Sequence, residues 1–200
     1  LLESHLSLFR NRRVGLVTQA AAVLPDMTHC LDVLLAAQVP LTAIYAPEHG
    51  LWGAAAEGEE IDTVIDKRSG LPIYSLYGKS YKPSPEMLAA VDLLVFDMQD
   101  IGTRYYTYQS TLNYLLQAAS EAGKSVIVLD RPNPINGVTV EGARLPEQHQ
   151  SFVGLAGLPN RHGLTIGEAA RWLNRGAHFP AAELSVIPML GWRRALWFDE

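Results

Sequence analysis

Three short polar segments hold the residue types best suited to chemistry. Residues 46–50 read Ala-Pro-Glu-His-Gly, residues 97–104 read Asp-Met-Gln-Asp-Ile-Gly-Thr-Arg, and residues 130–134 read Asp-Arg-Pro-Asn-Pro. Carboxylates and histidines held in a cleft can donate and accept protons, which suits several hydrolytic reactions. Glycoside hydrolysis, which ordinarily uses two carboxylates, is one of them. Each segment directly follows an apolar run of strand length. If those strands are parallel, the three segments meet at one edge of a sheet, where open α/β sheets bind their ligands.

The elements that would position these segments form an α/β pattern. Short apolar runs alternate with helical patterns, which predicts a mostly parallel sheet with helices on both faces. We expect strands over residues 14–18, 41–46, 73–76, 93–97, 125–130 and 184–188. We expect helices over 1–9, from an N-cap at Thr28 to 38, from an N-cap at Ser84 to 90, over 103–122, and from a Thr165–Glu168 capping box to 176. Residues 137–142 are a candidate hairpin within a stretch rich in Gly and Pro.

Each polar segment also has a purely structural interpretation. Asp97 and Asp130 stand at strand ends, where a carboxylate can cap the next helix or brace a loop. The Glu48-His49-Gly50 sequence can form a surface turn, because Gly50 supplies backbone freedom. His162 can simply end the loop before Thr165. The functional interpretation rests on the three segments lying at one edge.

Composition excludes several classes of protein. The chain has 200 residues, with 16 Lys and Arg against 21 Asp and Glu, so a net charge of −5 argues against a nucleic-acid partner. No apolar run is long enough for a membrane span. Cys30 is the only cysteine, which excludes an internal disulfide and a cysteine-based zinc cluster. The glycine motifs for dinucleotides and nucleoside triphosphates are absent, so we expect no cofactor. A metal site formed by His49, Asp97, Asp130 and His162 stays an alternative.

A series of ordered motifs resembles one bacterial family. They are APEHG at 46–50, EGE at 57–59, LPIYSLYG at 71–78, VFDMQDIG at 95–102, RYYTY at 104–108, LDRPNP at 129–134, VEG at 140–142, SFVG at 151–154 and RHGLTIGE at 161–168. Together they resemble the NamZ-type exo-β-N-acetylmuramidases. The resemblance spans nearly the whole chain. Two positions depart from the family pattern: Gln19 stands where Asn is expected, and Trp52 stands where Arg is expected.

The resemblance implies a fold, an activity and a set of site residues. It implies that residues 1–200 are a Rossmann-like N-terminal catalytic domain, with a smaller C-terminal domain outside this sequence. It implies an enzyme that releases terminal N-acetylmuramic acid from the non-reducing end of peptidoglycan fragments. The expected catalytic residues are Glu48 as general acid, then Glu141, with Asp97 as a further candidate. The expected substrate-binding residues are His49, Glu59, Gln99, Asp100, Arg104, Asp130, Arg131, Asn133, Arg161 and His162.

Recognition of the lactyl carboxylate of muramic acid calls for an arginine. Arg104 and Arg161 are the better candidates, because Arg131 directly follows Asp130 and is placed to brace an aspartate. Two other functions stay open: a muramyl-sugar-binding module without catalysis, and a metal-dependent hydrolase. A peptidoglycan substrate implies a periplasmic or extracellular location.

Overall fold

A computed structural model describes residues 5–53, 63–176 and 179–199 of the chain. The strands that it describes form one sheet in the order β3-β4-β2-β1-β5-β6-β7. Every neighbouring pair is parallel except β3 and β4. The strands are β1 Val14–Thr18, β2 Leu41–Ala46, β3 Val64–Ile65, β4 Pro72–Ser75, β5 Leu93–Asp97, β6 Ser125–Leu129 and β7 Glu183–Ile187.

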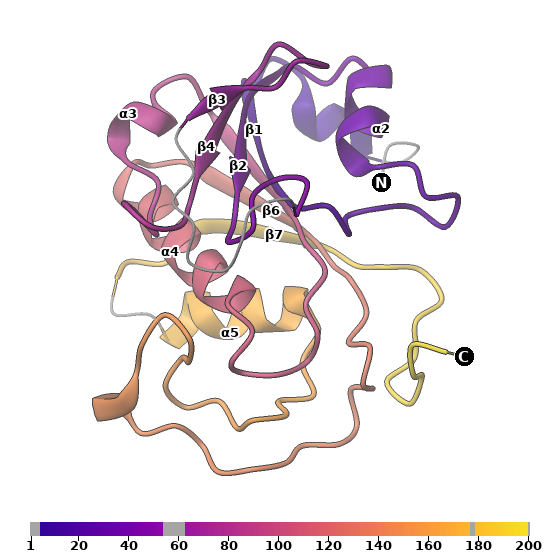
Figure 1. Cartoon of the computed structure of the whole chain (residues 1–200), viewed down its shortest axis with the longest axis vertical. Coiled ribbons are helices and arrows are strands. Elements are labelled where there is room, and N and C mark those ends of the chain that lie inside the picture. The colour runs from indigo at the N-terminus through magenta and orange to yellow at the C-terminus, as the bar shows by residue number, and fades with distance from the viewer. Residues whose placement is uncertain (1–4, 54–62, 177–178, 200) are drawn as a thin grey trace.

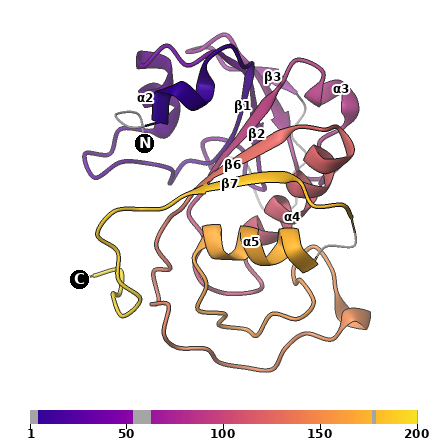
Figure 2. The same ribbon diagram turned by 180° about the vertical axis from the view of Figure 1, so that it is seen from behind.

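Helices cover both faces of this sheet (Figures 1 and 2). They are α2 Cys30–Ala36, α3 Pro85–Leu88, α4 Tyr108–Glu121 and α5 Ile166–Gly176, with short 3₁₀ turns η1 Leu6–Phe9 and η2 Glu147–His149. On one face, α4 and α5 pack on a core that includes Phe96 and Val128. On the other face, α2 and η1 pack on a core that includes Leu16 and Val95. The predicted α/β, Rossmann-like fold is therefore confirmed.

The parallel direction of the strands places their carboxyl ends at one edge of the sheet. β1 lies at the centre, with β2 on one side and β5 on the other, and both are parallel to it. Thr18 at the end of β1 is in register with Asp97 at the end of β5. Ala46 at the end of β2 is in register with Ser75 at the end of β4. The loops after β1, β2, β4, β5 and β6 consequently leave the sheet together, at what we call the carboxyl edge.

The central strands were predictable because they are continuously apolar and buried on both faces. Their bounds are confirmed within one residue, and Ser84 caps α3 by accepting a hydrogen bond from the Met87 N–H at 3.3 Å. The capping box of α5 is also present: Thr165 N–H donates to Glu168 at 3.0 Å, and Glu168 N–H donates to the Thr165 hydroxyl at 3.2 Å.

Four local predictions are wrong or incomplete. The N-cap of α2 is His29 rather than Thr28, and its Nδ1 accepts the Leu31 N–H at 3.2 Å. α4 begins at Tyr108 instead of residue 103. The hairpin predicted over 137–142 is absent, because Glu141 forms an antiparallel bridge with Arg161 instead of pairing within that segment. The first predicted helix is a 3₁₀ turn over Leu6–Phe9, and its first four residues lie outside the described part.

Candidate active site

Glu48 lies in a tight turn at the carboxyl edge, directly after β2. The Gly50 N–H donates to the Pro47 carbonyl at 3.0 Å. His49 and Gly50 both have positive φ, 70° and 74°, which turns the chain sharply back. Glu48 is half-buried, and its Oε2 accepts a hydrogen bond from the Thr107 hydroxyl at 3.1 Å. The turn therefore holds a carboxylate against the start of α4 while leaving it accessible, and His49 beside it is exposed.

Thr107 is a site residue that the sequence did not single out. It is the N-cap of α4, yet its hydroxyl makes no capping hydrogen bond and donates to Glu48 instead. The prediction that α4 begins at residue 103 would have placed Thr107 inside the helix. Thr107 could have been identified only by placing the start of α4 at Tyr108, and the RYYTY sequence carries no clear mark of that boundary.

Two tyrosines lie at the start of α4, near Glu48. Tyr106 and Tyr108 are 4.4 Å apart at the start of α4. Burial raises the pKa of Tyr108, and Tyr106 and the charge of Glu48 raise it further. The Tyr108 hydroxyl is therefore protonated at neutral pH, so Tyr108 does not serve as a general base.

Asp97 forms a separate ion pair with Arg131. The guanidinium donates from Nε to Oδ1 at 2.5 Å and from Nη2 to Oδ2 at 3.2 Å, and also from Nη1 to the Val23 carbonyl at 3.2 Å. The prediction that Arg131 braces an aspartate is confirmed. Cys30 lies close by, and burial together with the Asp97 charge raises the pKa of its thiol. That thiol is therefore protonated and unsuited to nucleophilic attack.

Asp100, Gln109 and His162 form a buried cluster between α4 and the loop before α5. The Gln109 amide lies 3.3 Å from Asp100 Oδ2 and 2.5 Å from His162 Nε2. His162 Nδ1 accepts the Leu164 N–H at 3.1 Å, and Asp100 Oδ2 accepts the Gly102 N–H at 2.8 Å. All three side chains are buried, so the cluster ties α4 to that loop.

Asp130 caps α5. It accepts hydrogen bonds from the Gly167 N–H at 2.7 Å and the Thr165 hydroxyl at 3.0 Å. Burial raises the pKa of Asp130 above its ordinary value, although these donors oppose the shift. Its contribution to the free energy of unfolding is therefore greatest at low pH and decreases as pH rises from an ordinary aspartate pKa through the raised one.

Gly167→Ala will destabilise the fold by about 1–3 kcal/mol, because an added Cβ overpacks this cap. That Cβ would lie 2.7 Å from Asp130 Cγ and 2.6 Å from Val186 Cγ1. Gly176→Ala at the end of the same helix is the matched control, since nothing lies within 4 Å of its Cβ position. Urea unfolding measures both variants. Equal stabilities of the two would contradict the close packing of the α5 cap.

The other predicted site residues brace loops near the same edge. Arg104 Nη1 donates to the Ala143 and Leu158 carbonyls at 2.9 and 2.7 Å. Asn133 donates to the Leu164 carbonyl at 2.9 Å, and Gln99 donates to the Pro132 carbonyl at 2.9 Å. Glu59 lies outside the described residues.

Glu141 and Arg161 form an ion pair at the surface. Arg161 Nη1 lies 2.8 Å from Glu141 Oε2, and the Glu141 side chain is 64% exposed. Arg161 also donates to the Ile135 carbonyl, and its guanidinium carbon lies 5.0 Å from the centre of the Trp197 ring. Arg161 is thus held on its inner side, while the side chain of its partner Glu141 is exposed to solvent.

The described site residues that follow β2, β5 and β6 therefore share one edge of the sheet but do not form one cluster. Glu48 is paired with Thr107, Asp97 with Arg131, Asp100 with His162 and Gln109, and Asp130 with α5. Within the described residues no three His, Cys, Asp or Glu side chains gather as a metal ion would require. No helix in the described ranges is long and apolar enough to cross a membrane.

This fold and this edge define an α/β domain with a half-buried glutamate at the carboxyl end of its sheet. The chain belongs to the family described as exo-β-N-acetylmuramidase NamZ, N-terminal, whose pattern matches residues 14–200. It is 44% identical to peptidoglycan β-N-acetylmuramidase NamZ of Bacillus subtilis strain 168, over all of this chain and 48% of that protein. The chain thus spans about half the length of this curated relative.

Two solved structures of DUF1343 family proteins from Bacteroides fragilis NCTC 9343 share the fold. One has 42% sequence identity and a TM-score of 0.91, covering 98% of this chain and 50% of that one. The other has 31% identity and a TM-score of 0.83, covering 98% of this chain and 52% of that one. The similarity extends over essentially the whole sheet and its helices.

Proposed function

We propose that this chain is the catalytic part of a glycosidase that removes terminal N-acetylmuramic acid from peptidoglycan fragments. Family membership supports the reaction class. The observation that carries the proposal is Glu48, a half-buried carboxylate that the Thr107 hydroxyl orients at the carboxyl edge. Glu48 acts as the general acid that protonates the leaving oxygen of the glycosidic bond. Such a substrate implies that the protein works in the periplasm or outside the cell.

The architecture supports an acid of this kind. The Glu48 turn is tight: His49 and Gly50 both have positive φ, and the Gly50 N–H donates a hydrogen bond to the Pro47 carbonyl. In contrast, Asp97 is 3% exposed and held by both arms of Arg131, which leaves it a positioning role.

The whole protein, assayed on 4-nitrophenyl β-N-acetylmuramide with and without a chelator, tests the reaction class. We expect release of nitrophenol at the same rate in both conditions. Activity lost in chelator and restored by a divalent metal would favour a metal-dependent hydrolase. Binding of the sugar without product would favour a muramyl-binding module.

Thr107→Val will lower kcat by about tenfold and leave KM nearly unchanged, because it removes one hydrogen bond that orients the acid. Valine keeps the shape of threonine, so packing at the start of α4 is preserved. Thr107→Ser restores the hydroxyl and is expected to recover most of the lost rate. A matching loss in the valine and serine variants would show that the hydroxyl is not what matters.

A further inference from the structure

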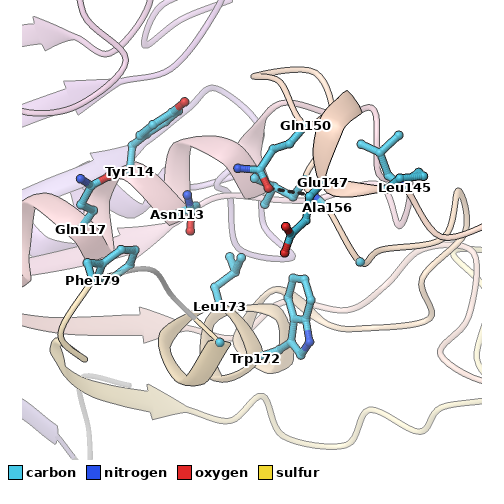
Figure 3. Close-up of a pocket in the computed structure, with 14 residues that line it drawn as sticks. Asn113, Tyr114, Gln117, Leu145, Glu147, Gln150, Ala156, Trp172, Leu173 and Phe179 are labelled. Carbon is cyan, nitrogen blue, oxygen red and sulfur yellow. Dashed lines mark hydrogen bonds between the residues drawn. The ribbon is translucent and has the colours of Figure 1, made fainter.

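A pocket of about 610 Å³ lies on the flank of the domain, away from the Glu48 turn. It is bounded by α4, α5 and the loop between β6 and α5 (Figure 3). Its volume is in the range of small-molecule sites. The lining combines aromatic, amide and aliphatic side chains with one carboxylate. The residues used below are Asn113, Tyr114, Glu147, Gln150, Gly157 and Trp172.

Contacts within the protein hold the walls of the pocket. Asn113 and Gln117 are one turn apart on α4 and belong to the same wall. The loop wall is held at both ends by Arg104, whose Nη1 bonds the Ala143 and Leu158 carbonyls. Within the loop, the Gly157 N–H donates to the Leu145 carbonyl at 2.8 Å. The pocket therefore lies between two helices and a loop that hydrogen bonds hold in place.

Trp172 of α5 forms an aromatic floor. The residue is 40% exposed, which is high for so large an apolar side chain. Gly157 adopts φ of +82°, and a Cβ there would lie 3.3 Å from the Trp172 ring. The glycine thus lets the loop backbone lie against the indole and hold it in place. Figure 3 shows Trp172, Asn113 and Glu147 around the same space.

The polar groups of the pocket are open to a ligand. In the part of the chain that the structure describes, the side chains of Asn113 and Glu147 make no hydrogen bond. Gln150 Oε1 accepts the Ala156 N–H at 3.1 Å, so its amide N–H groups stay available as donors. Lys, Arg and His are absent from the lining residues, and Glu147 is acidic. An anionic ligand would therefore be repelled, whereas hydroxyl and acetamido groups find both donors and acceptors.

We propose that this pocket is a second carbohydrate site that binds a neutral acetamido sugar, with Trp172 as the stacking surface. Amide side chains match an acetamido group because each offers one donor and one acceptor function. Tyr114 lines the pocket and lies two helical turns after Thr107, so the same helix α4 borders both the pocket and the carboxyl edge. Its ring stacks on Phe152 at 6.3 Å between centres, and Phe152 stacks on Tyr81 at 4.1 Å. A glycan held here would leave Glu48 free.

Titration of the whole protein with N,N′-diacetylchitobiose, followed by saturation-transfer NMR, tests the site. We expect a dissociation constant on the order of 1 mM, as befits a short neutral sugar on one aromatic surface. Trp172→Ala should weaken binding by about tenfold, and Asn113→Ala should weaken it by a smaller factor. Trp172→Phe keeps an aromatic ring and should retain most of the affinity, which separates stacking from a folding defect.

Trp52→Ala is the matched control, because Trp52 is 41% exposed and lies on the other side of the sheet, against His29. It should leave chitobiose binding unchanged, as should Glu48→Gln, so this test does not depend on the proposed reaction. No binding at 10 mM sugar, roughly ten times the expected constant, would overturn the proposal. Loss of binding in Trp52→Ala or Glu48→Gln, with Trp172→Ala unaffected, would overturn it as well.

Discussion

Glu48→Gln will lower the turnover of the whole protein on 4-nitrophenyl β-N-acetylmuramide by about 10² or more. Glutamine keeps the size of the side chain and can still accept the Thr107 hydrogen bond, so the turn after β2 is preserved. What it loses is the proton that a general acid gives to the leaving oxygen. Steady-state kinetics measures kcat, and titration with N-acetylmuramic acid measures whether binding persists.

Glu86→Gln provides the control for Glu48→Gln. Glu86 lies in the first turn of α3, is exposed, and is not among the residues that line the pocket. Its substitution should leave kcat unchanged. If Glu48→Gln turns over at the rate of the native protein, Glu48 is not the acid, and Glu141 becomes the next carboxylate to test.

The strands could be predicted because burial on both faces leaves a simple mark in the sequence. β1 and β5 are buried at every position, so each reads as an unbroken run ending in a polar residue. β3 leaves no such mark: it has two residues, both exposed, and is defined only by its antiparallel pairing with β4. The prediction of a hairpin over 137–142 is wrong for a related reason. Glycine spacing suggests a local turn, but Glu141 finds its partner twenty residues away in Arg161.

The sequence predicts at which edge of the sheet the candidate site lies, but not which side chains contact one another there. Parallel strands guarantee that residues 46–50, 97–104 and 130–134 leave the sheet together, and this is confirmed. The side on which each residue then lies depends on the path of the loop. Asp97 meets Arg131 beside Val23 and Cys30, near α2, whereas Glu48 meets Thr107 at the start of α4. Only the tertiary structure separates these two carboxylates.

We propose that Arg161 binds the lactyl carboxylate of muramic acid in place of Glu141. The guanidinium is held on its inner side by the Ile135 carbonyl and the Trp197 ring. Its outer partner is Glu141, a carboxylate that is 64% exposed, and surface ion pairs of this kind contribute only about 0–1 kcal/mol. In this proposal, the lactyl carboxylate replaces an exposed ion pair that itself contributes little free energy. N-acetylglucosamine lacks that group and gains nothing from Arg161.

Arg161→Leu should accordingly lower kcat/KM for the muramide by about tenfold, and for the matching glucosaminide far less. Arg161→Lys keeps the charge and should recover part of the loss, which distinguishes recognition from a folding defect. Glu141→Gln gives the sharper test, because the two roles predicted for Glu141 have opposite signs. If Glu141 competes with substrate for Arg161, this variant lowers KM for the muramide and leaves kcat alone. A large fall in kcat would instead make Glu141 part of the catalytic machinery, and equal losses for both sugars in Arg161→Leu would move lactyl recognition away from this arginine.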